Sequence, residues 1–297
     1  MRLHAASIAR YGYARPKQFC DFDGEGTLLA RTIRRALRVV PEHRVVVIAT
    51  EPWEREAQQS LAEFGRAALV MQPRNLDTTP GLLLPLLRIL GVDPEAQLLV
   101  LPSDHHVADE TQATKALLGA LASVAAAPEH VTLLGAVPTA SEEGYGWVVP
   151  GPSRGGVHQV SSFREKPPVE EATALFDGGA LLNTFMLAGQ ALTFAELFAT
   201  WAPGWWRAMV EARGGEARGS AARLTALYEV LPASNFSSAV LARAIDRLLV
   251  LAAPGLGWTD VGTPERLSRA LGPLSAQLGP GLADWRTASG RFVPARH

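Results

Sequence analysis

Two aspartates follow apolar runs whose length is typical of β-strands. Asp104 comes after the run in QLLVLPSDHH, and Asp260 follows LLVLAAP within GWTDVG. The carboxyl ends of strands in an open α/β sheet carry its ligand site, so both side chains could meet at one edge. Two carboxylates there suit Mg²⁺, which keeps several waters and binds one or two carboxylates together with substrate phosphates. The alternative for each aspartate alone is a cap on the following turn or helix.

Lysine is rare in this chain, and its positions are therefore informative. The sequence contains three lysines and 25 arginines. Lys17 in RPKQF precedes the first helical segment, and Lys166 in FREKP ends a strand-like run. An ammonium group binds phosphate as a point charge and follows it as the geometry changes during transfer. We expect both lysines to project into one shared cleft, with a solvated surface position as the alternative.

Further polar residues lie close to these charged groups in the sequence. His105 and His106 are adjacent, and adjacent residues of an extended segment point in opposite directions, so one metal ion does not suit both. We predict structural hydrogen bonds for them. Glu165 and Asn183 lie on strand-like runs and could accept from and donate to sugar hydroxyls. The alternative for Asn183 is a buried amide whose hydrogen bonds are satisfied within a strand.

Strand-like and helix-like segments alternate from residue 26 onward. Strands are predicted at 44–50, 67–72, 97–102 and 130–137, and helices at 27–40, 52–65, 78–91 and 110–127. We expect 97–102 to be a buried parallel strand, because it is an uninterrupted apolar run. Strands that alternate with helices of this length imply right-handed crossovers and an α/β fold with a doubly wound sheet.

The rhythm of the sequence changes after residue 137. Predicted next are strands at 144–151 and 156–167 joined by a glycine-rich turn, a helix at 169–179, a strand at 180–189 and a last strand at 248–254. The segment 190–246 is predicted to be mostly helical, with an exposed break at 211–223.

The composition argues against several classes of protein. A formal net charge of -1 provides no basic field that would recruit nucleic acid or a membrane surface. The longest apolar stretches fall short of the ~20 residues that a membrane span needs, and the first residues lack the apolar segment of a signal peptide. The single cysteine permits no internal disulfide, which favours a reducing, cytoplasmic compartment.

Seven motifs occur together in the order and approximate spacing of one known family. They are RPKQF, QPRNLDTTPG, LPSDHH, EEGYGWVVPG, FREKP, LLNTFML and GWTDVGTPERL. Over roughly residues 2–270 the chain resembles the sugar-1-phosphate nucleotidyltransferases, most closely the mannose-1-phosphate guanylyltransferase branch. The resemblance implies a Rossmann-like mixed sheet of the nucleotidyltransferase (GT-A-like) type with an inserted sugar-binding β/α lobe. It also implies a nucleotidyltransferase domain over 1–272, divided into a nucleotide-binding half (1–137) and a sugar-phosphate-binding half (138–272), and a short tail at 273–297.

The resemblance also implies roles for single residues. Asp104 and Asp260 would hold Mg²⁺, Arg2 and Lys17 would contact the phosphates, and Lys166 would hold the sugar phosphate. The sugar pocket would be lined by Gly146, Glu165 and Asn183. The nucleotide would lie against the segment from Gln72 to Thr79, with contacts from Gln72, Asn75, Thr78, Thr79 and Ser103.

The reaction implied by this family joins GTP and mannose 1-phosphate to give GDP-mannose and pyrophosphate. Positioning and charge neutralisation would do nearly all of the catalytic work, because no protein nucleophile is required. A homodimer is a further expectation. The alternatives are a related enzyme for another base or sugar, and a nucleotide-sugar-binding protein without catalysis.

Family members open with a strand and a glycine-rich loop whose backbone amides cradle the triphosphate. Here the sequence starts with MRLHAAS, where Arg2 matches the arginine that ends this loop. We therefore expect the strand and the loop to be encoded upstream of Met1. We also expect a cleft in the core of this chain, with unpaired backbone groups beside it.

Overall fold

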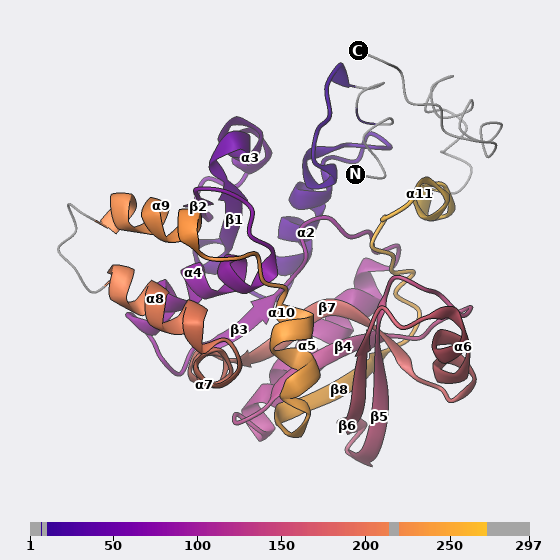
Figure 1. Cartoon of the computed structure of the whole chain (residues 1–297). Helices are drawn as coiled ribbons and strands as arrows, with labels where there is room; N and C mark the ends of the chain where they lie inside the picture. Colours follow the sequence, from indigo (N-terminus) through magenta and orange to yellow (C-terminus); the bar gives the residue numbers. More distant parts are fainter. Residues whose placement is uncertain (1–6, 8–10, 214–219, 272–297) are drawn as a thin grey trace.

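Two sheets form the framework of the protein (Figure 1). The structure is a computed structural model that describes residue 7 and residues 11–213 and 220–271. A small parallel sheet contains β1 (Val46–Thr50) and β2 (Ala68–Gln72). The larger sheet has six strands in the order β3-β7-β4-β8-β6-β5. Its strands are β3 (Gln97–Val100), β4 (Val131–Ala136), β5 (Gly146–Arg154), β6 (Val157–Glu165), β7 (Leu181–Gln190) and β8 (Leu248–Ala253).

The direction of β7 determines which residues meet at the edge of the larger sheet. β4 and β8 are parallel, whereas β7 lies between β3 and β4 and is antiparallel to both. Strands β3, β4 and β8 therefore run the same way and end at one edge. The prediction of a buried parallel strand at 97–102 is wrong in this respect. β3 pairs with antiparallel β7 and is an edge strand within the described chain, because β7 takes the place beside it.

Helices precede and follow most strands, as predicted. They are α2 (Leu28–Ala36), α3 (Glu54–Leu61), α4 (Thr78–Leu90), α5 (Glu110–Ala126), α6 (Val169–Asp177), α7 (Ala191–Trp201), α8 (Pro203–Arg213), α9 (Ser220–Val230), α10 (Phe236–Ala239) and α11 (Pro264–Leu271). None of the described helices is long and apolar enough to cross a membrane.

The helices differ from the predicted ones at two places. The predicted break at 211–223 is narrower than expected, because α8 continues to Arg213 and α9 is present from Ser220; residues 214–219 lie outside the described residues. Helix α11 was not predicted, although it begins with Pro264, a residue that favours the first position of a helix. The predicted tail at 273–297 and the predicted contact Arg2 also lie outside the described residues.

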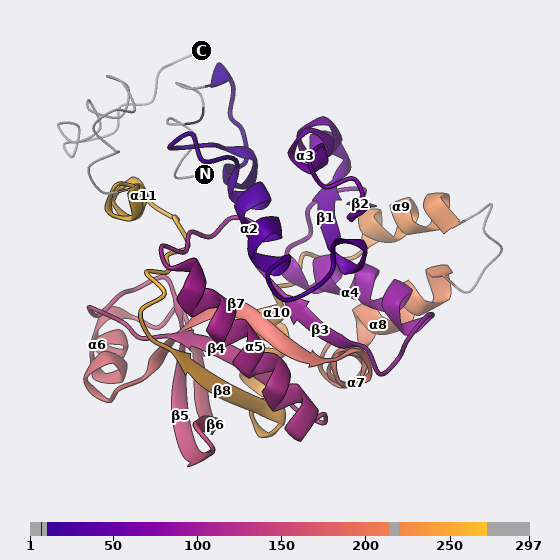
Figure 2. The same ribbon diagram turned by 180° about the vertical axis from the view of Figure 1, so that it is seen from behind.

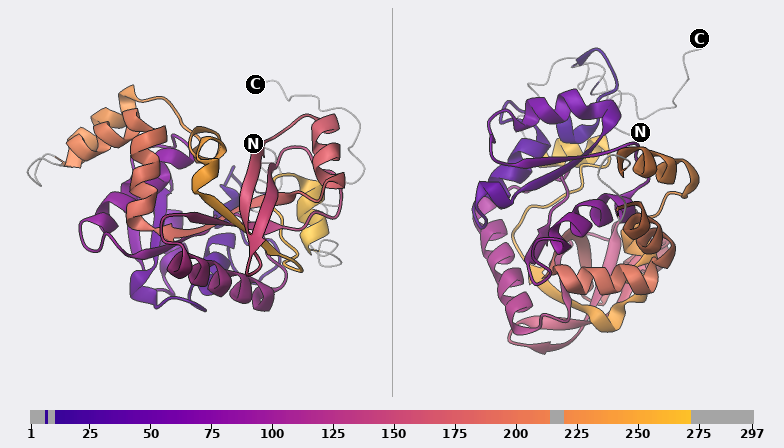
Figure 3. Two further views of the ribbon diagram at one scale, coloured as in Figure 1. Left: turned by 90° about the horizontal axis from the view of Figure 1, so that it is seen from below. Right: turned by 90° about the vertical axis from the view of Figure 1, so that its left-hand side faces the viewer.

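Helices cover both faces of the larger sheet, which confirms the doubly wound mixed α/β fold. On one face α5 buries Leu117 and Val124 against Leu134 of β4 and Met186 of β7, and Figure 2 shows this helix in front of the sheet. On the other face α4, α7, α8 and α10 enclose the largest apolar core. Helices α8 and α9 lie at one end of the molecule and the hairpin of β5 and β6 at the other (Figures 1 and 3).

A gap separates the two sheets. In the described chain β1 pairs with β2 and β3 pairs with β7, but β1 and β3 do not pair with each other. Residues 45–48 and residues 97–100 line the same cavity, whose volume is about 1020 Å³. This arrangement agrees with the expected cleft, and it leaves an open edge of backbone donors and acceptors on each sheet.

A close approach between β4 and β7 brings Asn183 into the larger sheet. Gly135 is the register partner of Asn183, next to an irregularity in the ladder. A Cβ atom at Gly135 would lie 2.7 Å from Cβ of Leu181. Glycine at 135 therefore allows the two strands to pair at this point.

We predict that Gly135→Ala destabilises the protein, because the added methyl group forces β4 and β7 apart. A loss of about 1–3 kcal/mol in the free energy of unfolding is expected from urea denaturation. Gly65→Ala is the control, because no heavy atom lies within 4 Å of the Cβ position there. Equal stability of the two variants would contradict the prediction.

Candidate active site

Lys17 connects the two aspartates that follow β3 and β8. It lies in a 3₁₀ turn, Lys17–Phe19, which is anchored by the buried ring of Phe19. The Lys17 Nζ atom is 3.0 Å from Asp104 Oδ2 and donates to the backbone carbonyl of Asp260 at 2.5 Å. Both aspartates line the large cavity. The structure thus brings together acidic residues from distant parts of the chain at one edge of the sheet.

The surroundings of Asp104 keep its carboxyl group ionised. Burial by itself raises the pKa of Asp104, but His105 and the ammonium group of Lys17 outweigh burial, and the pKa lies below the ordinary value. A nearby ammonium group favours the charged form of a carboxyl. Asp104 therefore offers a carboxylate, and not a neutral acid, to the cavity.

The segment around Asp260 is held in place by the segment around Asp104. His106 and Thr259 exchange backbone hydrogen bonds of 2.9 and 3.1 Å. Asp260 Oδ1 accepts from the Gly262 amide at 2.8 Å, from the Tyr145 hydroxyl at 3.1 Å and from Arg266 Nη1 at 3.1 Å. Neither Tyr145 nor Arg266 was predicted as a site residue, although they lie in the motifs EEGYGWVVPG and GWTDVGTPERL.

The two aspartates form a donor set that fits Mg²⁺. Among the described residues, no group of three or more histidine, cysteine, aspartate or glutamate side chains could hold a metal ion. Two carboxylates with room for phosphate oxygens and water match the usual Mg²⁺ site. A closed structural zinc site would need four nitrogen or sulfur ligands, so it does not fit here.

The side chains of the adjacent residues His105 and His106 differ in their hydrogen bonds. Trp258 Nε1 donates to Nδ1 of His105 at 3.2 Å, which confirms the predicted structural hydrogen bond for this residue. Burial lowers the pKa of His105 below its ordinary value, and Asp104 partly opposes burial. For His106 the structural hydrogen bonds are those of its backbone with Thr259, and its buried Nε2 has no hydrogen-bond partner among the described residues. Burial, with Arg31 and Arg35, lowers the pKa of His106 to about 4.

The three residues expected at the sugar pocket lie together. Gly146 and Glu165 are register partners of β5 and β6. A Cβ atom at Gly146 would lie 2.8 Å from Glu165 Oε2 and 3.3 Å from Asn183 Cβ, so a larger residue would fill this space. All three residues line the cavity, and so does Lys166, whose Nζ atom is 3.5 Å from Glu165 Oε1.

Only some of the residues expected to contact the nucleotide line the cavity. Gln72, Asn75, Thr78 and Ser103 line the cavity. Thr79 does not: its side chain is fully buried, and its hydroxyl accepts from Ser234 Oγ at 2.9 Å. Lys17 is also absent from the lining and contacts two lining residues instead, so of the two lysines expected in one cleft only Lys166 lines it.

Backbone strain concentrates around the same cavity. Four described residues other than glycine have a positive φ, namely Asp77 (72°), Lys166 (48°), Phe185 (59°) and Val261 (45°). Three of them line the cavity, and Val261 follows Asp260 directly. Such conformations are costly and cluster at active sites and ligand clamps. The strain therefore supports this cavity as the candidate functional site independently of any resemblance.

Comparison with known proteins gives the family. Residues 12–275 match the sequence profile of the nucleotidyl transferase family. The chain belongs to this family. The matched range includes the cavity-lining residues and both aspartates.

Several relatives of this nucleotidyl transferase are similar over most of the chain. The xanthan biosynthesis protein XanB of Xanthomonas campestris is 30% identical over 253 residues, which are 84% of this chain and 53% of XanB. A putative mannose-1-phosphate guanylyltransferase of Vibrio cholerae is 27% identical, over 84% of this chain and 54% of that protein. The chain thus spans about half the length of the curated relatives it matches.

A solved structure shares the fold. The crystal structure titled mannose-1-phosphate geranyltransferase from Thermus thermophilus superimposes with a TM-score of 0.77 and 28% identity. The superposition covers 90% of this chain and 76% of that one. It supports the expected nucleotidyltransferase fold with its mixed, Rossmann-like sheet.

We predict that binding of the sugar phosphate weakens at low pH and that this weakening depends on Glu165. Burial raises the pKa of this carboxyl above its ordinary value, and Lys166 only partly opposes burial. Glu165 therefore takes up a proton at a higher pH than an exposed glutamate does. The KM for the sugar-phosphate substrate should rise as the pH falls through this pKa, and Glu165→Gln should remove that part of the pH profile. Profiles of the same shape in both proteins would contradict the prediction.

Proposed function

We propose that this nucleotidyl transferase joins GTP to mannose 1-phosphate and uses Mg²⁺ as its cofactor. One observation carries the proposal: Lys17 contacts both Asp104 and Asp260 beside a cavity that also holds the predicted sugar-site residues. The names of the Vibrio cholerae and Thermus thermophilus relatives both mention mannose 1-phosphate, which supports this sugar as the acceptor.

In the proposed reaction a phosphate oxygen of mannose 1-phosphate attacks the α-phosphorus of GTP. The bond from this phosphorus to the oxygen that bridges to the β-phosphorus breaks, and pyrophosphate leaves. Asp104 and Asp260 would hold Mg²⁺, which when bound neutralises charge on the triphosphate. Lys17 adds positive charge at the same edge of the sheet, and Lys166 would bind the phosphate of the sugar. No covalent intermediate with the protein is needed.

The remaining cavity residues would orient the two substrates. Glu165 and Asn183 offer acceptors and a donor for sugar hydroxyls next to Gly146. Gln72, Asn75 and Thr78 belong to the same cavity lining and would contact the base and ribose. Holding the attacking oxygen in line with the leaving pyrophosphate is then the main catalytic task.

Pyrophosphate release measured with a panel of substrates tests this proposal. GTP, ATP, UTP and dTTP are each combined with mannose 1-phosphate or glucose 1-phosphate and Mg²⁺, for this chain and for a version extended upstream of Met1. GTP with mannose 1-phosphate should give the highest kcat/KM. If another pair of substrates gives the highest kcat/KM, the proposed substrates are wrong but the proposed type of reaction is retained. Binding of nucleotide sugars without pyrophosphate release in either version would favour the non-catalytic alternative.

We predict that Asp104→Asn and Asp260→Asn each lower kcat by about 100-fold or more, because each removes one carboxylate from the proposed metal site. Thermal unfolding should show that both variants remain folded. The control is Asp246→Asn, which changes an exposed aspartate outside the cavity lining and should keep parental turnover. Parental turnover in either of the first two variants would remove that residue from the site.

A further inference from the structure

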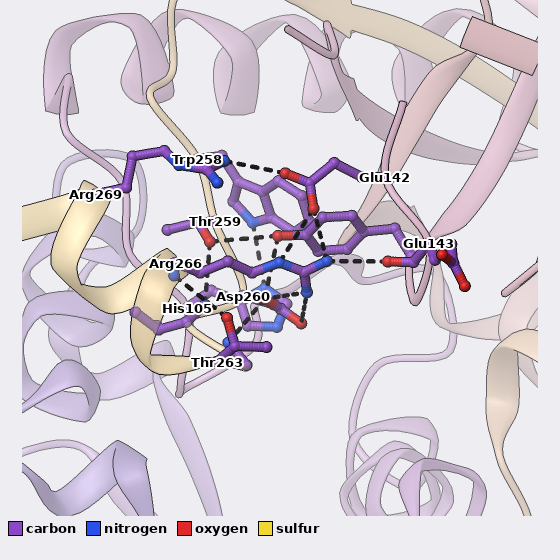
Figure 4. Close-up of polar contacts among 12 residues, drawn as sticks. His105, Glu142, Glu143, Trp258, Thr259, Asp260, Thr263, Arg266 and Arg269 are labelled. Carbon is purple, nitrogen blue, oxygen red and sulfur yellow. Dashed lines mark hydrogen bonds and ion pairs between the residues drawn. The ribbon is translucent and has the colours of Figure 1, made fainter. Parts of the chain in front are cut away.

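Arg266 of α11 lies at the centre of a polar network behind Asp260 (Figure 4). Its side chain is only 12% exposed. The Nη2 atom donates to Glu142 Oε2 at 2.8 Å and to the backbone carbonyl of Glu143 at 3.0 Å. The Nη1 atom lies 3.1 Å from Asp260 Oδ1 and 3.2 Å from Asp260 Oδ2. One guanidinium group therefore binds two carboxylates and a backbone carbonyl.

Tyr145 completes this network. The Arg266 guanidinium carbon lies 3.9 Å from the centroid of the Tyr145 ring, and the Tyr145 hydroxyl donates to Asp260 Oδ1 at 3.1 Å. Tyr145 immediately precedes Gly146, which lines the expected sugar pocket. The network thus connects the segment of Asp260 to the segment 142–146.

Charge balance explains why an arginine is stable in this position. A largely buried guanidinium group needs paired charges and satisfied hydrogen bonds, and Glu142 and Asp260 supply both. The planar group also restricts the carboxylate of Asp260 to one orientation, which a flexible ammonium group would do less well. Arg266 is absent from the lining of the large cavity, so it reaches the site only through Asp260 and Tyr145.

We propose that Arg266 is a positioning residue for the reaction proposed above. It holds the Asp260 carboxylate and the segment 142–146 in one arrangement, so that the metal-binding edge and the sugar pocket form together. This inference rests on the proposed function of the site. It assigns to α11, which the sequence analysis did not predict, a direct part in the geometry of the site.

The first test compares Arg266→Gln with Arg269→Gln. Arg269 is 68% exposed and binds the same Glu142, at 3.0 Å, so it is a matched control outside the contact with Asp260. We expect Arg266→Gln to lower kcat about 10-fold or more and Arg269→Gln to change kcat less than 2-fold. In an Asp260→Asn background, Arg266→Gln should cause a smaller loss than in the parental protein, because part of its effect passes through that carboxylate. Full additivity of the two losses would overturn the inference.

The second test measures Mn²⁺ binding by electron paramagnetic resonance without substrates. Arg266→Gln should weaken Mn²⁺ binding about 5-fold or more, and Arg269→Gln should leave it unchanged. If Arg266→Gln does not fold, the same two measurements are made on Arg266→Lys. Parental Mn²⁺ affinity and parental kcat in Arg266→Lys would overturn the inference. Parental turnover of Asp260→Asn would instead overturn the proposed function of the site. Impaired Asp260→Asn together with parental Arg266→Gln would overturn the inference about Arg266 alone.

Discussion

The contact of the Lys17 ammonium group with Asp104 and Asp260 is the interaction on which the site depends. β3 and β8 are not neighbours in the sheet, so Asp104 and Asp260 come from strand ends that β7 and β4 separate. The Lys17 ammonium group connects them through the Asp104 carboxylate and the backbone carbonyl of Asp260, and it contributes to the lowered pKa of Asp104. Because Phe19 anchors the same turn in the core beside α2, the ammonium group is held by packing and not only by charge.

The direction of a single strand explains why the proposed sugar and metal sites are neighbours. β7 runs opposite to β3, β4 and β8, so its beginning lies where those strands end. Asn183 lies near that beginning and faces the same cavity as the two aspartates. If β7 were parallel to its neighbours, Asn183 would lie at the opposite edge of the sheet from the two aspartates. The antiparallel strand, which pairs with β4 at Gly135, thereby brings the proposed sugar site to the same edge as the proposed metal site.

Local pattern was sufficient to predict most elements and the main acidic residues. Apolar runs of strand length ending in Asp104 and in the segment of Asp260 identified the sheet edge, because the end of such a run has a fixed place in an α/β fold. The pairing of β3 with β7 could not be predicted, since it depends on contacts between distant residues. The same reason applies to Thr79, whose hydroxyl is hydrogen-bonded to Ser234, and to Arg266, which binds the carboxylate of Asp260.

The most direct measurement is a crystal structure of the protein soaked with Mn²⁺ and a nonhydrolysable GTP analogue, using the anomalous signal of manganese. The account predicts one peak at about 2.1 Å from carboxylate oxygens of both Asp104 and Asp260, with phosphate oxygens completing the coordination. A manganese peak bound by neither aspartate, with the nucleotide present in the cavity, would contradict it.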